Sequence, residues 1–340
     1  MTPTPLPDLD DVLSTLSVVQ IPMRVRFRGL SVREVALVRG PVGWGEFGPF
    51  PEYDDLESSR WLAAALEAGW LGWPAPQRDS VPVNATVPAI PANDVGDILA
   101  RYDGCSTAKV KVAERGQRLE DDVDRVAAVR EGMGSQARIR VDANGGWTVD
   151  EATDALRRLS AYGLEYAEQP CATVEELARL RVALARNGID VLVAADESIR
   201  KADDPMRVVR ERAADVIVVK VAPLGGVRAA LAIAEECGLP TVVSSALDTS
   251  VGIRAGLALA AALPELPFAC GLGTVELMAG DVTDDSLVPV AGSTTLRDLT
   301  VDQELLDKWQ APADRQSWWR ERLIRCHAQC AKGSSSRSPW

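Results

Sequence analysis

Charged side chains recur at the ends of short apolar runs in this chain of 340 residues. A buried strand normally ends in turn residues, so acids and lysines at several strand ends predict one shared polar site at the mouth of a barrel. Three of these residues are acids, and hard carboxylate oxygens from adjacent strands suit Mg2+. The residues are Lys109 and Lys111 in AKVKV, Asp142 in IRVDAN, Glu168 in YAEQP, Asp196 in LVAADES and Lys220 in VIVVKV.

This set of residues points to proton abstraction beside a carboxylate. A lysine could remove the proton α to a substrate carboxylate while Mg2+ stabilises the resulting enediolate. The only histidine is His327, so hydrolase triads and histidine-rich zinc sites have no partner to work with. The alternative is that these charges are solvated loop residues. Two features oppose it, because the preceding runs are too apolar for surface strands and because Lys109 and Lys111, two residues apart, share one face.

The spacing of these sites predicts the elements that position them. Successive strand ends from Lys111 to Lys220 are 24 to 31 residues apart, which fits one strand and one helix each. Amphipathic segments such as 122–133 and 149–163 fill the gaps. With VNATV near residue 85 as the first strand and FACGLG as the last, eight strands predict an α/β fold with a (β/α)8-type barrel. An open doubly wound sheet would instead gather its polar residues at one switch point.

The chain before and after the barrel follows a different pattern. Residues 1–82 predict an N-terminal α+β capping domain with three strands, a helix and a proline-rich linker. The barrel would occupy residues 83–284. A C-terminal segment at about 285–325 would join the capping domain, and residues 326–340 would form a disordered tail.

Composition limits the partners of the protein. The chain has 37 basic and 49 acidic residues and a net charge of −12, which disfavours nucleic acid and anionic membranes. Its first residues lack the basic and apolar regions of a secretion signal, and the apolar stretch at 255–263 is too short to cross a bilayer. We therefore expect a cytoplasmic enzyme that acts on a small-molecule carboxylate, with no nucleic acid or membrane partner, as a monomer or a small homo-oligomer.

The order KxK, D, E, D, K on strands two to six resembles the enolase superfamily, in particular its muconate-lactonizing-enzyme subgroup. The resemblance covers nearly the whole chain, including the capping domain. Within the subgroup, the segments GEFGPFPEYDD (45–55), PLGGV (223–227) and SSALDTSVG (244–252) resemble the o-succinylbenzoate synthases, which are dehydratases of menaquinone biosynthesis. The combination is specific, whereas no single segment is.

The resemblance implies a role for each candidate residue. Three acids would bind Mg2+, for which Mn2+ could substitute, one lysine would be the acid/base, and a second lysine would face it across the site. These residues are, in that order, Asp142, Glu168 and Asp196; Lys111; and Lys220. Lys109 and Asn144 would support the acid/base, and substrate would contact Arg140, Ser245, Gly271, Phe50 and Tyr53. The loop that contains the last two would close over substrate and exclude water.

The implied reaction is the loss of water from 2-succinyl-6-hydroxy-2,4-cyclohexadiene-1-carboxylate, which gives 2-succinylbenzoate. Lys111 would take the α proton and then assist the loss of hydroxide. Lys220 would act as a fixed cation that stabilises the planar intermediate.

Other activities on the same scaffold are alternatives. The resemblance argues against a dipeptide epimerase, because CGLGTVE lacks a DxD motif, and against an N-acylamino acid racemase, because the seventh strand reads SSALDTS. A muconate-type cycloisomerase is harder to exclude from the strand ends. A non-enzymatic barrel that only binds metal is disfavoured, since it would not need two opposed lysines.

Overall fold

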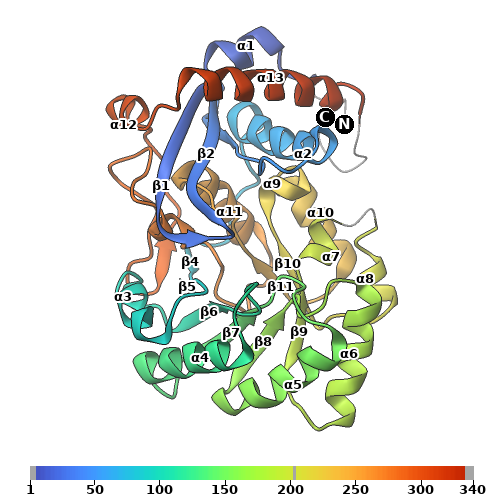
Figure 1. Cartoon of the computed structure of the whole chain (residues 1–340). Helices are drawn as coiled ribbons and strands as arrows, with labels where there is room; N and C mark the ends of the chain where they lie inside the picture. Colours follow the sequence, from blue (N-terminus) through green and yellow to red (C-terminus); the bar gives the residue numbers. More distant parts are fainter. Residues whose placement is uncertain (1–4, 202–203, 334–340) are drawn as a thin grey trace.

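The chain folds into a barrel with a smaller domain over one of its ends (Figure 1). The computed structural model describes residues 5–201 and 204–333. In Figure 1 the N-terminal elements and the last long helix lie at the top, and the barrel with its surrounding helices lies below them.

Seven parallel strands form the wall of the barrel. Their order in the sheet is their order in the chain, so each strand is joined to its neighbour by a crossover connection. The strands are β5 (Ala85–Val87), β6 (Thr107–Lys111), β7 (Arg138–Asp142), β8 (Leu164–Glu168), β9 (Leu192–Ala195), β10 (Val216–Val219) and β11 (Thr241–Val243). Apolar side chains of β8 to β11, including Tyr166 and Val218, pack inside the barrel.

The eighth predicted strand is reduced to two isolated bridges. Cys270 bridges to Val83 just before β5, and Gly271 bridges to Ser244 just after β11, so together they link the two edges of the sheet. A β-carbon at Gly271 would lie 2.5 Å from the Ser244 hydroxyl oxygen, so a larger residue here would have to displace the Ser244 side chain. The run FACGLG predicted the place of this segment but not its shortness. The pairing is short because glycine weakens regular strand pairing.

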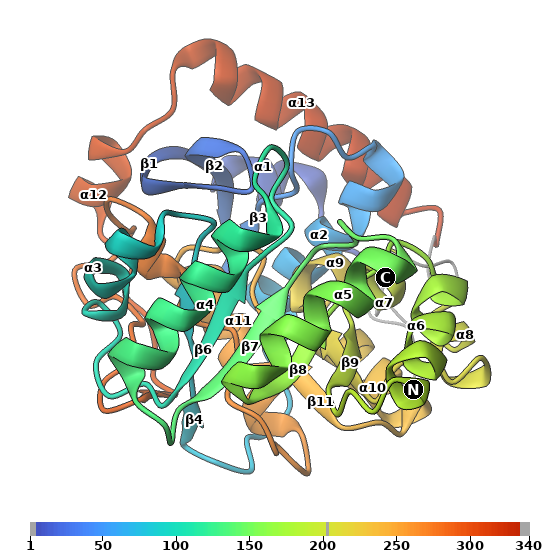
Figure 2. The same ribbon diagram turned by 60° about the horizontal axis from the view of Figure 1, so that its bottom comes forward.

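Helices cover the outside of the barrel, as Figure 2 shows for the face of α4, α5 and α6. Two of them begin at capping boxes, in which Thr148 and Glu151, or Thr173 and Glu176, exchange hydrogen bonds between side chain and backbone. The helices of five or more residues around the barrel are α3 (Val95–Leu99), α4 (Leu119–Met133), α5 (Val149–Leu159), α6 (Val174–Arg186), α10 (Val227–Cys237) and α11 (Ser250–Ala262). The four-residue helices are α7 (Glu197–Arg200), α8 (Arg207–Arg210) and α9 (Val221–Leu224). Within the described part of the chain, no helix combines the length and the apolar character that crossing a membrane requires.

The capping domain is a three-stranded antiparallel sheet packed against a helix. Its elements are α1 (Leu9–Ser14), β1 (Ser17–Phe27), β2 (Leu30–Arg39), β3 (Trp44–Phe47) and α2 (Asp55–Leu66), which continues as a π-helical turn at Glu67–Leu71. Phe47 and Trp61 lie in its hydrophobic core together with Trp319 from the C-terminal end of the chain. The tip of the β1–β2 hairpin reaches the barrel, where the Lys111 ammonium lies 5.4 Å from the centre of the Phe27 ring.

The C-terminal segment returns to the capping domain. β12 (Ser293–Thr295) pairs with β4 (Ser80–Pro82), and α12 (Gln303–Lys308) is followed by α13 (Ala313–Cys330), which crosses the capping domain at the top of Figure 1. The prediction of a disordered tail from residue 326 is wrong for 326–330, because Cys326 and Cys330 are buried in α13 against the core of the capping domain. Residues 334–340 lie outside the described residues. The remaining domain boundaries stay predictions.

Arg322 of α13 provides a test of this packing. Its buried guanidinium donates to the carbonyl oxygens of Phe50 at 2.9 Å and Tyr53 at 2.7 Å. Arg322→Met should lower the free energy of unfolding by about 3 kcal/mol, because several buried acceptors lose their donor. Urea unfolding followed by circular dichroism measures this change. The control is Arg325→Met, which removes a partly exposed ion pair with Asp55 and should cost less than about 0.5 kcal/mol; equal effects would contradict the expectation.

Candidate active site

The parallel register places lysines and acids at one level of the barrel mouth. Lys111 of β6 is paired with Asp142 of β7, which in turn is paired with Glu168 of β8. Asp196 and Lys220 directly follow β9 and β10. Because β6 and β10 are four positions apart in the strand order, Lys111 and Lys220 approach the acids from opposite sides. The structure therefore brings together the charged residues that the strand ends predicted.

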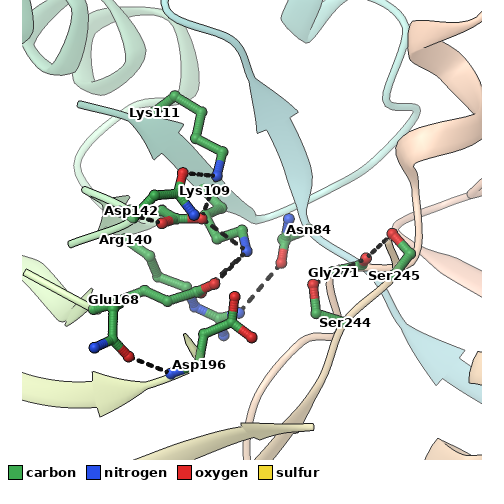
Figure 3. Close-up of polar contacts among 12 residues, drawn as sticks. Asn84, Lys109, Lys111, Arg140, Asp142, Glu168, Asp196, Ser244, Ser245 and Gly271 are labelled. Atoms are coloured by element: carbon green, nitrogen blue, oxygen red, sulfur yellow. Dashed lines mark hydrogen bonds and ion pairs between the residues drawn. The ribbon is translucent and has the colours of Figure 1, made fainter. Parts of the chain in front are cut away.

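Two of the acids are paired with lysines of β6 (Figure 3). The Lys109 Nζ atom lies 2.9 and 3.0 Å from the two carboxylate oxygens of Glu168, and the Lys111 Nζ atom lies 2.5 Å from Oδ2 of Asp142. Both acids and Lys109 are buried. Pairing of this kind is necessary, because an uncompensated charge in such a position is strongly destabilising.

The third acid, Asp196, is held by cations at both of its oxygens. Lys220 Nζ lies 2.6 Å from Oδ2, and Arg200 Nε lies 3.1 Å from Oδ1. Arg200 also donates to Glu197 at 2.6 Å and to the hydroxyl of Tyr53 in the capping domain at 3.4 Å. Glu197 and Arg200 are not among the site residues predicted from the sequence. The spacing of four residues between Asp196 and Arg200 in DESIR is the signal for such a pair on a helix.

Burial and neighbouring charges act in opposite directions on the pKa values of this site. Burial lowers the pKa of Lys109, but the charges of Glu168 and Asp142 outweigh it and hold that pKa well above its ordinary value. Burial raises the pKa of Asp142, but the two neighbouring lysines outweigh it and hold this pKa far below its usual range. Burial also raises the pKa of Asp196, and the charges of Arg200 and the adjacent lysine overcome it and lower the pKa to about 2. Lys109, Asp142 and Asp196 are therefore charged at neutral pH.

The donor set has the chemistry that a hard divalent cation requires. Asp142, Glu168 and Asp196 bring carboxylate oxygens from three consecutive strands to one rim, and Mg2+ prefers such ligands. Within the described residues, no group of three or more potential ligands converges on one point, because each of these acids is turned toward a cationic side chain. The type and placement of the donors, rather than a preformed cage, support a cation here.

Asn144 connects the two sides of the mouth. It has a left-handed backbone conformation with φ of +47°, which asparagine tolerates better than most residues. Its Oδ1 atom accepts a hydrogen bond from Lys111 at 2.5 Å, and its Nδ2 atom donates to Glu197 at 3.2 Å. A continuous set of contacts thus runs from Lys111 through Asn144, Glu197 and Arg200 to Asp196.

Arg140 lies two residues before Asp142 in β7, deeper inside the barrel. Its side chain is fully buried, and its guanidinium donates to Glu165 at 2.5 Å and to the carbonyl of Ala269 at 2.6 Å. It also contacts Asn84 at 3.3 Å, as Figure 3 shows. Arg140 lies on the same face of β7 as Asp142, as the sequence predicts. Its protein partners do not favour a contact with substrate, and that contact stays a prediction.

Ser245 and Gly271 lie on another part of the rim (Figure 3). The Ser245 hydroxyl donates to the Gly271 carbonyl at 2.8 Å and lies 2.7 Å from the Thr274 hydroxyl. These contacts join the loop after β11 to the segment that closes the barrel. The predicted contact of both residues with substrate stays a prediction.

Phe50 and Tyr53 are packed inside the capping domain. Their rings meet edge to face with centres 5.6 Å apart, and Phe50 also packs on Trp61. Both side chains are buried. Only the Tyr53 hydroxyl reaches toward the acids, through its contact with Arg200. The loop therefore lies over the barrel as a packed unit, and direct contact of the Phe50 ring with substrate is not favoured by its position.

Comparisons with known proteins decide the family. Two family models match, one described as enolase N-terminal domain-like over residues 18–69 and one as enolase C-terminal domain-like over residues 95–300. The chain is 58% identical to the o-succinylbenzoate synthase of Mycolicibacterium smegmatis over 324 residues, and this match covers 95% of this chain and 98% of that protein. The chain belongs to the o-succinylbenzoate synthase family. An o-succinylbenzoate synthase of Thermobifida fusca is 57% identical over 307 residues, which cover 88% of this chain and 95% of that protein.

Solved structures agree with the fold of this family. Muconate lactonizing enzyme from Pseudomonas fluorescens matches with a TM-score of 0.73 and 20% identity, over 87% of this chain and 98% of that one. The L-Ala-D/L-Glu epimerase from Bacillus subtilis matches with a TM-score of 0.71 and 22% identity, over 84% and 96%. With the family models, these matches confirm the predicted (β/α)8-type barrel with an N-terminal α+β capping domain, the enolase-superfamily architecture.

The buried pair of Lys109 and Glu168 generates a stability prediction. Lys109→Met should lower the free energy of unfolding by about 3–5 kcal/mol, because Glu168, whose pKa is raised to about 7 by burial and by the charge of Asp142, is left buried without its cationic partner. Combining it with Glu168→Gln should restore much of this loss, since both charges are then removed. Urea unfolding in excess chelator measures both variants. Lys308→Met at an exposed position is the control and should stay within about 0.5 kcal/mol; a double variant no more stable than Lys109→Met would contradict the pairing.

Proposed function

We propose that this chain is a Mg2+-dependent hydro-lyase that converts 2-succinyl-6-hydroxy-2,4-cyclohexadiene-1-carboxylate to 2-succinylbenzoate in menaquinone biosynthesis. The observation that carries the proposal is a buried group of three acids between lysines from opposite sides, in a chain that is 55–58% identical to o-succinylbenzoate synthases. A cytoplasmic location and a small-molecule carboxylate substrate belong to the same proposal. The net charge of −12 supports the absence of a nucleic acid partner.

In this proposal the three acids act as metal ligands. Asp142, Glu168 and Asp196 would hold Mg2+, and Mn2+ would replace it, since both ions prefer oxygen ligands. The bound cation supplies positive charge beside the substrate carboxylate, so negative charge that develops there is stabilised.

In this proposal Lys111 acts as the single acid/base. Its amine takes the proton from the carbon α to the carboxylate, and the electron pair of the broken C–H bond is first held in the enolate form of that carboxylate. The same pair then forms the new ring double bond as the C–O bond breaks. The ammonium returns the proton to the departing hydroxyl, so water leaves and the ring becomes aromatic. The contacts of Lys111 with Asp142 and Asn144 support this part, because they fix the position of Nζ at the rim.

The remaining residues orient these groups. Lys220 would stay a cation opposite Lys111 and stabilise the charge that develops on the substrate. Lys109 would hold Glu168 in place through their 2.9 Å ion pair. Ser245 and Gly271 would lie at the succinyl end of the substrate.

Dependence on the metal is tested by one acid and a matched control. Asp196→Asn should lower kcat/KM by more than about 100-fold, because a neutral amide is a poor ligand for Mg2+ and leaves Lys220 without its partner. Product formation is followed by the absorbance of the aromatic ring, and circular dichroism checks the fold. Asp190→Asn, the same change at an exposed position, should leave kcat/KM within about twofold. Full activity of the unmodified enzyme in excess chelator would contradict this part of the proposal.

Variants of the two lysines, Lys111 and Lys220, distinguish a dehydratase from a racemase. Lys111→Ala should abolish both product formation and exchange of the substrate α proton with solvent, since one base serves both. Lys220→Arg should retain more activity than Lys220→Ala, because arginine keeps the charge but is too weak an acid to lose its proton. Product formation and exchange in deuterated water of a succinylated amino acid are measured separately. Racemisation that needs both lysines equally, without dehydration of the cyclohexadiene, would show an N-acylamino acid racemase instead.

A further inference from the structure

The loop between β11 and α11 belongs to the barrel but is built into the capping domain. It spans Ser244–Thr249 and contains Leu247, whose side chain is buried in the same hydrophobic cluster as Phe50, Tyr53 and Trp61. The backbone of Leu247 is left-handed, with φ of +65°. Leucine rarely adopts this conformation, so the surrounding contacts have to maintain it.

Two buried residues of the capping domain provide these contacts. Arg33 of β2 donates from Nε to the carbonyl oxygen of Leu247 at 2.9 Å. Glu46 of β3 accepts from the amide of Thr249 at 3.1 Å, from its hydroxyl at 2.5 Å and from the amide of Gly252 at 3.1 Å. Glu46 therefore binds the end of the loop and the first turn of α11, across the boundary between the domains.

The same loop forms part of the rim of the candidate active site. Ser244 and Ser245 are its first residues, and Ser245 is tied to Gly271 on the closing segment of the barrel. A displacement of Leu247 or Thr249 would shift these serines, because they are only a few bonds away. The capping domain thus reaches the rim through the backbone of this loop.

We propose that Arg33 and Glu46 are positioning residues that hold the loop Ser244–Thr249 in the conformation that receives the succinyl end of the substrate. This inference rests on the proposed function for the identity of the substrate. Neither residue touches the acids or the lysines of the rim in any described hydrogen bond or ion pair, so their effect is on substrate binding rather than on proton transfer.

The charges around Glu46 make this positioning sensitive to pH. Asp248 from the loop and Arg33 from β2 face Glu46, and Lys220 from the barrel and Arg33 face Asp248. A cavity of about 20 Å3, lined by Glu46, Asp248 and Ser244 among others, adjoins the pair. Burial first, and then the charge of Asp248, raise the pKa of Glu46 to about 8. Glu46 is therefore mostly protonated below pH 8, and it gains a buried negative charge beside Asp248 as the pH rises through this value.

Glu46→Gln is the decisive variant, because glutamine keeps the shape and the acceptor oxygen of the protonated acid but cannot ionise. The dissociation constant of 2-succinylbenzoate, measured by calorimetry with Mg2+ present, should rise about tenfold between pH 7 and pH 9 in the unmodified chain, since only the protonated fraction binds well. In Glu46→Gln the rise should be less than about threefold. The same rise in both proteins overturns the proposal.

Glu67→Gln is the matched control. Glu67 is also a buried acid of the capping domain, and it accepts hydrogen bonds from the first amides of another barrel helix, those of Val227 at 2.5 Å and Arg228 at 3.2 Å. It is not bonded to the loop Ser244–Thr249. Glu67→Gln should therefore show the pH dependence of the unmodified chain, and a flat profile in this control would overturn the proposal by showing a general effect of domain contact.

Amide hydrogen exchange separates this inference from the proposed function. In Glu46→Ala the amides of Thr249 and Gly252 should exchange at least about tenfold faster than in the unmodified chain, whereas Glu67→Ala should leave them within about twofold. Failure of the unmodified chain to bind 2-succinylbenzoate would refute the proposed function, and exchange would still decide whether Glu46 holds the loop. Unchanged exchange of both amides in Glu46→Ala overturns the inference.

Discussion

Compensation of buried charge is the constraint on which the mouth of this barrel depends. Several ionisable groups are buried at one rim, and each unpaired one would cost far more than a single packing contact contributes. The parallel register meets this constraint, because it places Lys111 beside Asp142 and Asp142 beside Glu168. A slip of one residue would turn these side chains to the outer face, among the apolar contacts of the helices. The register and the pairing of charges therefore stabilise each other.

Buried polar groups are also paired at the contact between the two domains. Glu46 and Glu67 of the capping domain accept hydrogen bonds from the first amides of α11 and α10, which have no acceptor within their own helices. Arg322 of α13 in turn satisfies carbonyl groups of the loop that contains Phe50. The capping domain is thus fixed by polar contacts at defined points as well as by its apolar core.

Local patterns in the sequence were enough for the barrel and for the charged rim, and long-range partners were not. Lys111 and Asp142 could be predicted, because a strand-end position at a regular spacing determines the rim a side chain reaches. The structural setting of Arg140 could not, since Glu165 becomes its partner only through an irregularity in the pairing of β7 and β8. Cys330 was assigned to a tail because nothing near it in the chain shows that α13 packs on the capping domain.

The fold alone does not determine which reaction such a rim performs. Chains of 20–22% identity with muconate lactonizing or epimerase activity in their names share this barrel and cap. Fold and opposed strand ends are therefore compatible with several chemistries, and selection among them has to come from what surrounds the substrate beyond the acids and lysines. In the proposal made above the loop after β11 is such a part, and its backbone at Leu247 is held by Arg33 of the other domain. Under that proposal substrate selection and domain contact depend on the same few hydrogen bonds, so a change in the capping domain would alter specificity without any change among the acids and lysines of the rim.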